Sequence, residues 1–290
     1  MRLSSTSLFA IPALIWGSTF FVIKFQLGEV DPTWSVSYRF VLAGVILLIY
    51  SKLRKLNLNF SSREHLRMAL QGSLLFGFNY WFVYIAEQEL VSALVAVMFS
   101  CIIFLNVFFG RIFLKKLAEK KVYIGALLGI LGTLLLFRQE LLGLGKADFK
   151  AFHLTICFVS VIIASLGNIA SAFNQKKSMP VIQTNAFGML YGGIIIAIMA
   201  LVTGSEMSID ISFSYLSSLL YLSIFGSIIA FGSYLTLIGK IGADKAGYVL
   251  LVIPVIAVSL SVVFEDYLFG WHLIVGMILI LGGNIIVLKK

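Results

Sequence analysis

Long apolar segments separated by short polar ones run along the whole chain. A helix needs about 20 apolar residues to cross the hydrocarbon core of a bilayer. Helices are expected because lipid offers the main chain no hydrogen-bond partner. The pattern therefore predicts an all-α integral membrane protein with ten transmembrane helices, near residues 5–25, 34–51, 67–86, 90–113, 121–137, 151–173, 184–203, 214–238, 246–264 and 271–288.

The composition excludes a soluble domain. Hydrophobic residues make up 60% of the 290 residues and charged residues 12%, whereas a soluble domain has about 45–50% and about 25%. In a soluble protein the net charge of +9 would suggest a nucleic-acid partner. Here the basic residues lie in short clusters between apolar segments, so we expect a lipid bilayer and no nucleic acid as partner.

The basic clusters also predict the orientation of the chain. Most of the 22 Lys and Arg residues fall in alternate connections, whereas most acidic residues fall in the opposite ones. Basic connections stay in the cytoplasm. With ten crossings, both termini are then expected on the cytoplasmic side of the plasma membrane, which is the inner membrane in a two-membrane cell.

The two halves of the chain resemble each other weakly. The pair Gly125 and Gly132 recurs with the same spacing as Gly276 and Gly283. Each half contains five predicted helices, an odd number, so the second half must enter the membrane in the opposite direction. We therefore predict two inverted five-helix repeats, a common transporter plan, with the first repeat at 1–137, a linker loop at 138–150 and the second repeat at 151–290.

Several motifs resemble those of a known family. Residues 242–283 combine a start in small residues, Pro254 within the predicted helix, Glu265 at its end and a final helix with spaced glycines. The first half has Trp16-Gly17-Ser18, then Arg39-Phe40. This layout resembles the EamA family of the drug/metabolite transporter (DMT) superfamily over nearly the whole chain. The resemblance implies a plasma-membrane carrier that exports amino acids and other small metabolites.

The first half departs from that pattern. Ile103 stands at the position equivalent to Pro254, and Leu114 at the position equivalent to Glu265. If the proline is a point where the helix flexes, only the second repeat keeps it. Symmetric rocking of the two repeats is therefore not assured.

A carrier needs a polar path lined by helix faces, and helical spacing indicates candidates. Ser73, Gly77, Tyr80 and Tyr84 share one face, for example. Small residues also suit close packing of helices, and aromatic residues also anchor at membrane interfaces. The aromatic residues weakly favour a bulky apolar or aromatic solute. The predicted substrate-binding residues are Trp16, Ser18, Thr19, Arg39, Asn79, Tyr80, Tyr84, Phe99, Asn168, Ser171, Asn174, Tyr234 and Tyr248.

Arg39 is the charged residue of the apolar stretch 35–50, and three roles are open for it. Its side chain can extend to the outer interface. It can form an ion pair at the outer mouth with Glu87, Glu89 or Glu265, which would make Arg39, Glu87 and Glu265 gating residues together with Pro254. It can also bind a substrate carboxylate, which suits the fork of donors in a guanidinium.

The predicted function is facilitated transport of small metabolites by alternating access. Every Asp and Glu lies at a predicted helix end or in a connection, whereas proton-driven carriers usually place an acid deep in a helix, so facilitated movement is the simpler interpretation. Proton antiport is left open, because a carboxylate in a connection can line an open vestibule. The alternatives are a non-transporting partner subunit and a membrane enzyme, but no catalytic motif supports an enzyme. We expect no metal and no cofactor, and either a monomer or a homodimer.

Overall fold

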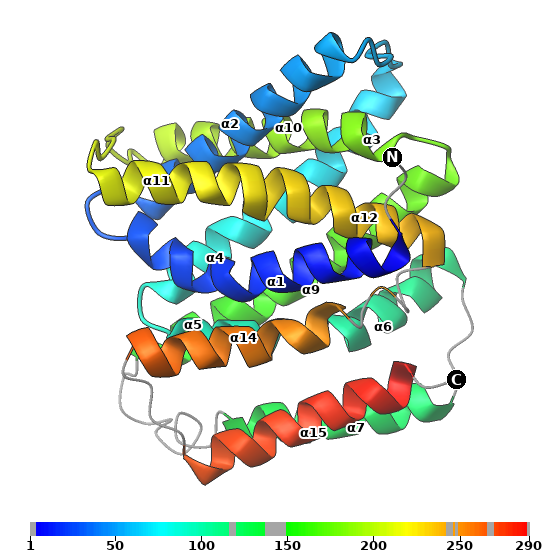
Figure 1. Ribbon diagram of the computed structural model, residues 1–290, viewed down its shortest axis with the longest axis vertical. Coiled ribbons are helices and arrows are strands. Elements are labelled where there is room, and N and C mark those ends of the chain that lie inside the picture. The colour runs from blue at the N-terminus through cyan, green and yellow to red at the C-terminus, as the bar shows by residue number, and fades with distance from the viewer. Residues whose placement is uncertain are drawn as a thin grey trace.

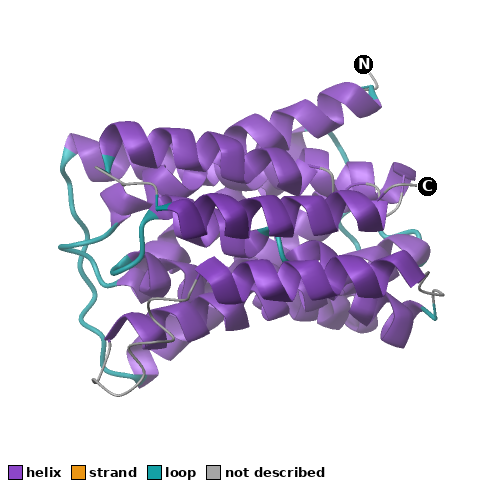
Figure 2. Ribbon diagram, turned by 90° about the horizontal axis from the view of Figure 1, so that it is seen from below, coloured by secondary structure: helices purple, strands orange, loops and turns teal. Residues whose placement is uncertain are grey.

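The computed structural model describes residues 4–115, 120–136, 149–241, 246, 249–265 and 270–288. These residues form helices joined by short connections, and no strand occurs among them (Figure 2). The helices are α1 Ser5–Ile23, α2 Pro32–Leu53, α3 Ser62–Gly72, α4 Asn79–Glu87, α5 Ser92–Phe99, α6 Ile102–Leu114, α7 Lys120–Leu136, α9 Phe149–Lys176, α10 Val181–Val202, α11 Phe213–Tyr221, α12 Ala230–Ile241, α14 Val249–Phe264 and α15 Trp271–Leu288.

Polar side chains cap the starts of several helices. The side chain of Asp31 accepts a hydrogen bond from the main-chain nitrogen of Thr33 (2.7 Å), with Pro32 at the first helical position of α2. Ser61 and Glu64 form a capping box at the start of α3. These bonds satisfy main-chain N–H groups that have no partner within the helix.

Six helical segments in the described part of the chain are long and apolar enough to cross a membrane. The protein is therefore a multi-pass membrane protein. The helices follow the ten predicted segments, but the remaining ones are too short or too little apolar to count by this measure, so ten crossings stay a prediction. The six segments are Ser5–Gln26, Pro32–Leu53, Ser92–Leu114, Ala151–Lys176, Val181–Val202 and Phe213–Ile241.

Equivalent helices of the two halves pack against each other in opposite directions. In the pair α2–α10, Gly44 lies against Ala186 and Leu190, whereas Gly193, further along α10, lies against Ser37 and Val41, nearer the start of α2. A side chain at Gly44 would place its Cβ atom 2.7 Å from the nitrogen of Leu190. Antiparallel packing of equivalent helices is what inverted repeats require.

The pair α7–α15 follows the same rule. Gly132 lies against the main chain of Gly276, and Gly283 lies against that of Gly125. The pair lies at one edge of the molecule, beside α6 and α14 (Figure 1). The first helix, α1, begins at the same end of the bundle at which the last helix, α15, ends (Figure 1).

Two helices change their winding in the middle. A π-helical segment η2, Ser73–Phe78, joins α3 to α4, and a second one, η3, Leu222–Ile229, joins α11 to α12. The segments occupy equivalent places in the two halves. η2 packs on α9 and α10, and η3 packs on α1 and α2. Wider turns of this kind are frequent at functional sites.

Candidate substrate cavity

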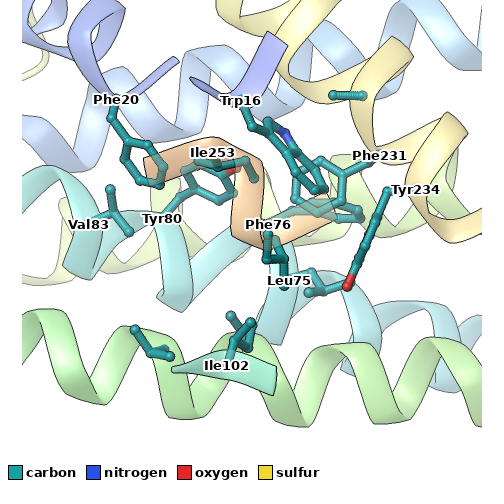
Figure 3. Packing of buried hydrophobic residues seen from close by; sticks show 14 of the residues in the cluster. Trp16, Phe20, Leu75, Phe76, Tyr80, Val83, Ile102, Phe231, Tyr234 and Ile253 are labelled. Atoms are coloured by element: carbon teal, nitrogen blue, oxygen red, sulfur yellow. The ribbon is translucent and has the colours of Figure 1, made fainter. Parts of the chain in front are cut away.

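A cavity lies in the middle of the bundle between helices of both halves. About 50 Å³ of it is open to the centres of water molecules, room for a few waters at about 10–15 Å³ each. Figure 3 shows the aromatic residues around it converging from α1, α4 and α12. The lining residues are Trp16, Thr19, Phe20, Ile23, Leu75, Asn79, Tyr80, Val83, Ala96, Phe99, Ile102, Ala164, Asn168, Phe231, Tyr234, Leu250 and Ile253.

Trp16 joins the two halves at the cavity wall. Its indole nitrogen donates a hydrogen bond to the main-chain oxygen of Gly226 (3.1 Å). Its ring meets the edges of Phe231 and Tyr234, at centroid distances of 4.8 and 5.1 Å (Figure 3). Aromatic pairs of this geometry add to the free energy of burial. These contacts fix the position of the largest side chain in the wall.

Two polar atoms of the lining residues are buried without a hydrogen-bond partner in the described residues. They are the side-chain oxygen of Asn79 and the hydroxyl of Tyr234. The amide nitrogen of Asn79 donates to Leu75 of its own helix (3.2 Å). An unpaired buried polar group costs about 1–3 kcal/mol. These atoms suit a partner that enters the cavity.

A further polar cluster lies beside the cavity. The side-chain oxygen of Asn106 accepts hydrogen bonds from Ser165 (2.8 Å) and from Asn168 (3.4 Å). Asn168 lines the cavity, so the cluster connects the cavity wall on α9 to α6. Helical spacing in the sequence indicates Ser165 and Asn168 on one face of α9, whereas Asn106 is not among the predicted residues.

Arg39 is fully buried, with 0% of its surface exposed. Its Nε donates to the hydroxyl of Ser227 (3.0 Å), and its Nη1 lies 3.5 Å from the hydroxyl of Tyr84. The guanidinium carbon lies 4.4 Å from the ring centroid of Tyr80, which lines the cavity. Extension of Arg39 to the outer interface is therefore wrong, because stacking and hydrogen bonds hold the guanidinium inside the bundle.

The suggested ion pairs of Arg39 do not form in this structure. Glu87 is also fully buried, and neither of its carboxylate oxygens has a hydrogen-bond partner in the described residues. Glu265 instead accepts hydrogen bonds from Ser92, through its nitrogen (3.3 Å) and hydroxyl (3.1 Å), and from the hydroxyl of Ser261. Glu89 is exposed. Nη2 of Arg39 is left without a partner among the described residues.

Lys24 is a half-buried cation close to Glu87. Its ammonium donates to the main-chain oxygens of Glu87 (2.5 Å) and Leu90 (2.6 Å), just where α4 ends. A cation near the last carbonyls of a helix is favourable. We call Lys24, Arg39 and Glu87 the charged end of the cavity. It lies where α1 ends and α2 begins, on the left in Figure 1.

Neutral amides occupy the opposite end. Gln71 donates to Asn185 (3.3 Å) and accepts from Asn174 (2.9 Å), which ties α3 to α10 and α9. Gln175 donates to the main-chain oxygen of Leu235 on α12 (3.1 Å). We call Gln71, Asn174, Gln175 and Asn185 the amide end. Helical spacing in the sequence indicates Gln175 on the same face as Asn168. Gln71 and Asn185 are not among the predicted residues, although an amide within an apolar segment is itself a signal that a buried partner exists.

The structure brings about half of the predicted binding residues to the cavity. The others lie elsewhere: the hydroxyl of Ser18 contacts that of Tyr221 (2.7 Å), Tyr84 contacts Arg39, and Asn174 belongs to the amide end, with Ser171 beside it on α9. Pro254 is buried in α14 next to a lining residue, and Tyr248 lies outside the described residues. Those that line the cavity are Trp16, Thr19, Asn79, Tyr80, Phe99, Asn168 and Tyr234.

The chain belongs to the EamA-like transporter family. The sequence model of that family matches twice, at residues 3–138 and 152–289. A helical membrane protein with two such matches is a membrane transporter of this class, as the resemblance implied.

Individual relatives agree with this assignment. The chain is 29% identical over 257 residues to the uncharacterized inner membrane transporter YedA of Escherichia coli K12, covering 88% of this chain and 80% of YedA. It is 24% identical to the uncharacterized transporter YoaV of Bacillus subtilis, covering 89% and 84% of the two chains. A solved crystal structure shares the fold over 99% of this chain and 96% of its own, with a TM-score of 0.71 and 21% identity.

Proposed function

We propose that the protein is a carrier that moves small metabolites through the central cavity by alternating access. Its most suitable solutes are amino acids or related compounds with a bulky apolar or aromatic group, which it would export. The observation that carries this proposal is the cavity itself, because both halves line it with aromatic rings and with two unpaired polar atoms. Binding sites for small molecules combine apolar walls with a few oriented polar groups in this way.

The cavity has room for only a few water molecules, so it must widen to take up an aromatic amino acid. We therefore take this structure as a contracted state, in which neither end is open wide enough for a solute. Binding requires the charged end or the amide end to move away from the cavity. The paired units 1–137 and 151–290, packed with equivalent helices antiparallel, would open one end while closing the other.

Arg39 is the group we assign to a carboxylate of the solute. Its unpaired Nη2 and its stacking on Tyr80 place a permanent positive charge directly behind the cavity wall. A guanidinium binds a carboxylate through two parallel hydrogen bonds. A movement of Tyr80 would expose these donors to the cavity.

We place the carrier in the inner (plasma) membrane with both termini cytoplasmic. The basic connections support this orientation, and the relative YedA is named as an inner membrane transporter. The start of α1 and the end of α15 lie at the same end of the bundle, as this orientation requires (Figure 1). The charged end then faces outward and the amide end faces the cytoplasm.

The test is exchange transport in liposomes. Vesicles containing purified protein and an unlabelled neutral amino acid are diluted into trace labelled amino acid at equal pH, and accumulated label is counted. We expect accumulation above that in empty vesicles for at least one bulky apolar or aromatic amino acid. A panel of amino acids, nucleobases and vitamins that gives no exchange would contradict the proposal.

A further inference from the structure

Glu87 has an unusual environment for a carboxyl group. It is fully buried at the end of α4, and both of its side-chain oxygens lack a hydrogen-bond partner among the described residues. An ionised carboxylate without partners is very costly in an apolar environment, and such a group takes up a proton instead. The buried position itself therefore calls for a neutral, protonated Glu87 in this conformation.

The neighbouring charges do not supply a partner. Lys24 begins a short 3₁₀ helix, η1 (Lys24–Gln26), and uses its ammonium for the main-chain oxygens of Glu87 and Leu90. Arg39 on α2 contacts Ser227 and the ring of Tyr80. Glu265, after α14, is a second carboxyl group near Glu87. Cys157 is the neighbouring titratable group on α9, and His153 lies one turn before it, also buried.

Glu87 is linked to the cavity along one face of its own helix. Tyr80, Tyr84 and Glu87 follow one another at helical spacing, so they lie on the same side of α4. Tyr84 contacts Arg39, and Tyr80 lines the cavity. Movement of this face away from α2 would open the charged end and admit water to Glu87.

Building on the proposed function, we propose that Glu87 is a proton-binding site that controls the opening of the charged end. In the closed state the carboxyl group keeps its proton. On opening, the O–H bond breaks, the proton passes to water and the electron pair stays on the carboxylate, which then pairs with the ammonium of Lys24. Closing takes the proton up again, so no other reactant is needed.

The proposal fixes the direction of the pH effect. Because the closed state binds one more proton than the open state, a higher pH at the charged end favours opening, by about tenfold per pH unit at most. The hydrogen bonds of the amide end join neutral amides, so they do not depend on pH in this range. Solute exchange limited by this opening should therefore become faster as the pH rises.

The test uses Glu87→Gln, which keeps the shape and neutrality of the protonated acid, with Glu89→Gln as the matched control at an exposed position two residues away. Infrared spectra of the full-length protein at neutral pH should show the carbonyl band of a protonated carboxylic acid. We expect Glu87→Gln to lose this band and Glu89→Gln to keep it. A wild-type spectrum without the band, or a band retained in Glu87→Gln, would overturn the proposal.

Exchange in liposomes, measured from mildly acidic to mildly alkaline pH equal on both sides, gives the functional readout. We expect slow, pH-independent exchange in Glu87→Gln and wild-type pH dependence in Glu89→Gln and in His153→Gln, which removes the histidine on α9. If Glu87→Gln keeps the wild-type profile, or if His153→Gln abolishes it, Glu87 is not the controlling group.

Two further outcomes are separable. If no solute is exchanged at any pH, the proposed function fails, while the infrared band still decides the protonation of Glu87. If Glu87→Gln does not fold, Lys24→Gln takes its place, because it keeps Glu87 and removes the partner of its ionised form. We then expect the band to persist to higher pH than in the wild type, and an unchanged titration would contradict the proposal.

Discussion

The two ends of the central cavity are built from different chemistry. At the charged end, Lys24, Arg39 and Glu87 are brought together in or beside the apolar core, and two of them keep polar atoms without a partner in the described part of the chain. At the amide end, Gln71 forms hydrogen bonds with neutral Asn174 and Asn185, and the unpaired atom there is the uncharged amide nitrogen of Asn185, which has no partner among the described residues. Equivalent helices of the two halves thus carry different groups, and the buried acid among the described residues, Glu87, lies at the charged end.

The two halves share the same backbone arrangement around the cavity. The segments α3–η2–α4 and α11–η3–α12 have the same order of α- and π-helical turns, and both contribute to the cavity wall. Duplication preserved this backbone, whereas the side chains at the two ends diverged. The fold therefore sets where an end can open, and the side chains set what controls the opening.

The largest expected effect comes from disrupting the shared backbone packing. A Cβ atom at Gly72 would collide with the main-chain oxygen of Gly188, and main-chain atoms cannot rotate away. We expect Gly72→Ala to destabilise the protein by about 3 kcal/mol or more. Thermal unfolding in detergent measures this, with Gly232→Ala as the control, because no described atom lies within 4 Å of that Cβ position. Equal unfolding temperatures for the two variants would contradict the close approach of α3 and α10.

The charged end can be broken at Arg39. Arg39→Gln removes the stacking on Tyr80 and the bond to Ser227, and a desolvated cation–π contact alone is worth about 2 kcal/mol. We expect lower stability and loss of carboxylate-solute exchange. Arg39→Lys should restore little, because an ammonium lacks the planar fork. If Arg39→Gln has the same unfolding temperature and the same exchange rate as the wild type, the guanidinium has neither a structural nor a binding role.

A change at the amide end sharpens the contrast. Gln71→Met removes the hydrogen bonds of Gln71 to Asn174 and Asn185. We expect this loss to lower the free energy of unfolding by about 1–3 kcal/mol. The pH profile of exchange should keep its wild-type shape, because no titrating group is removed. A flattened profile in Gln71→Met would show that both ends share one pH-dependent step.

The smallest effect is expected outside the cavity, at the exposed start of α3. There the main-chain nitrogen and hydroxyl of Ser61 both donate to Glu64 (2.7 Å each) and hold the pKa of that carboxyl below its usual value. A lowered pKa in the folded state stabilises at neutral pH, and the stabilisation is lost as the pH falls through that pKa. Ser61→Ala should therefore lower the unfolding temperature slightly at neutral pH and by less in acid. A difference that grows in acid would contradict this sign.

The sequence predicts the helices well, because apolar length is the signal that a bilayer imposes. It also indicates the polar and aromatic part of the cavity wall: Trp16, Asn79 and Tyr234 stand out within apolar segments. It does not identify apolar lining residues such as Phe231 and Ile253, which have the same pattern as core residues. Only packing in three dimensions separates them.

The role of Arg39 could not be settled from the sequence for a related reason. The position of Arg39 along its own helix predicts that its side chain can extend to the interface. The partners of the guanidinium, however, come from α4 and η3, which are far away in the chain. The acid Glu87 likewise stands at a helix end, where exposure is the ordinary expectation, and is buried by its neighbours. Burial across helices is not encoded in the spacing of a single one.

The central claim is that solute occupies the cavity between the two halves, and filling that cavity tests it most directly. Ala164 lines the cavity on α9, whereas Ala170, on the same helix, does not. We predict that Ala164→Leu folds but loses exchange of labelled amino acid in liposomes, while Ala170→Leu exchanges like the wild type. Full exchange by a folded Ala164→Leu variant would contradict the account.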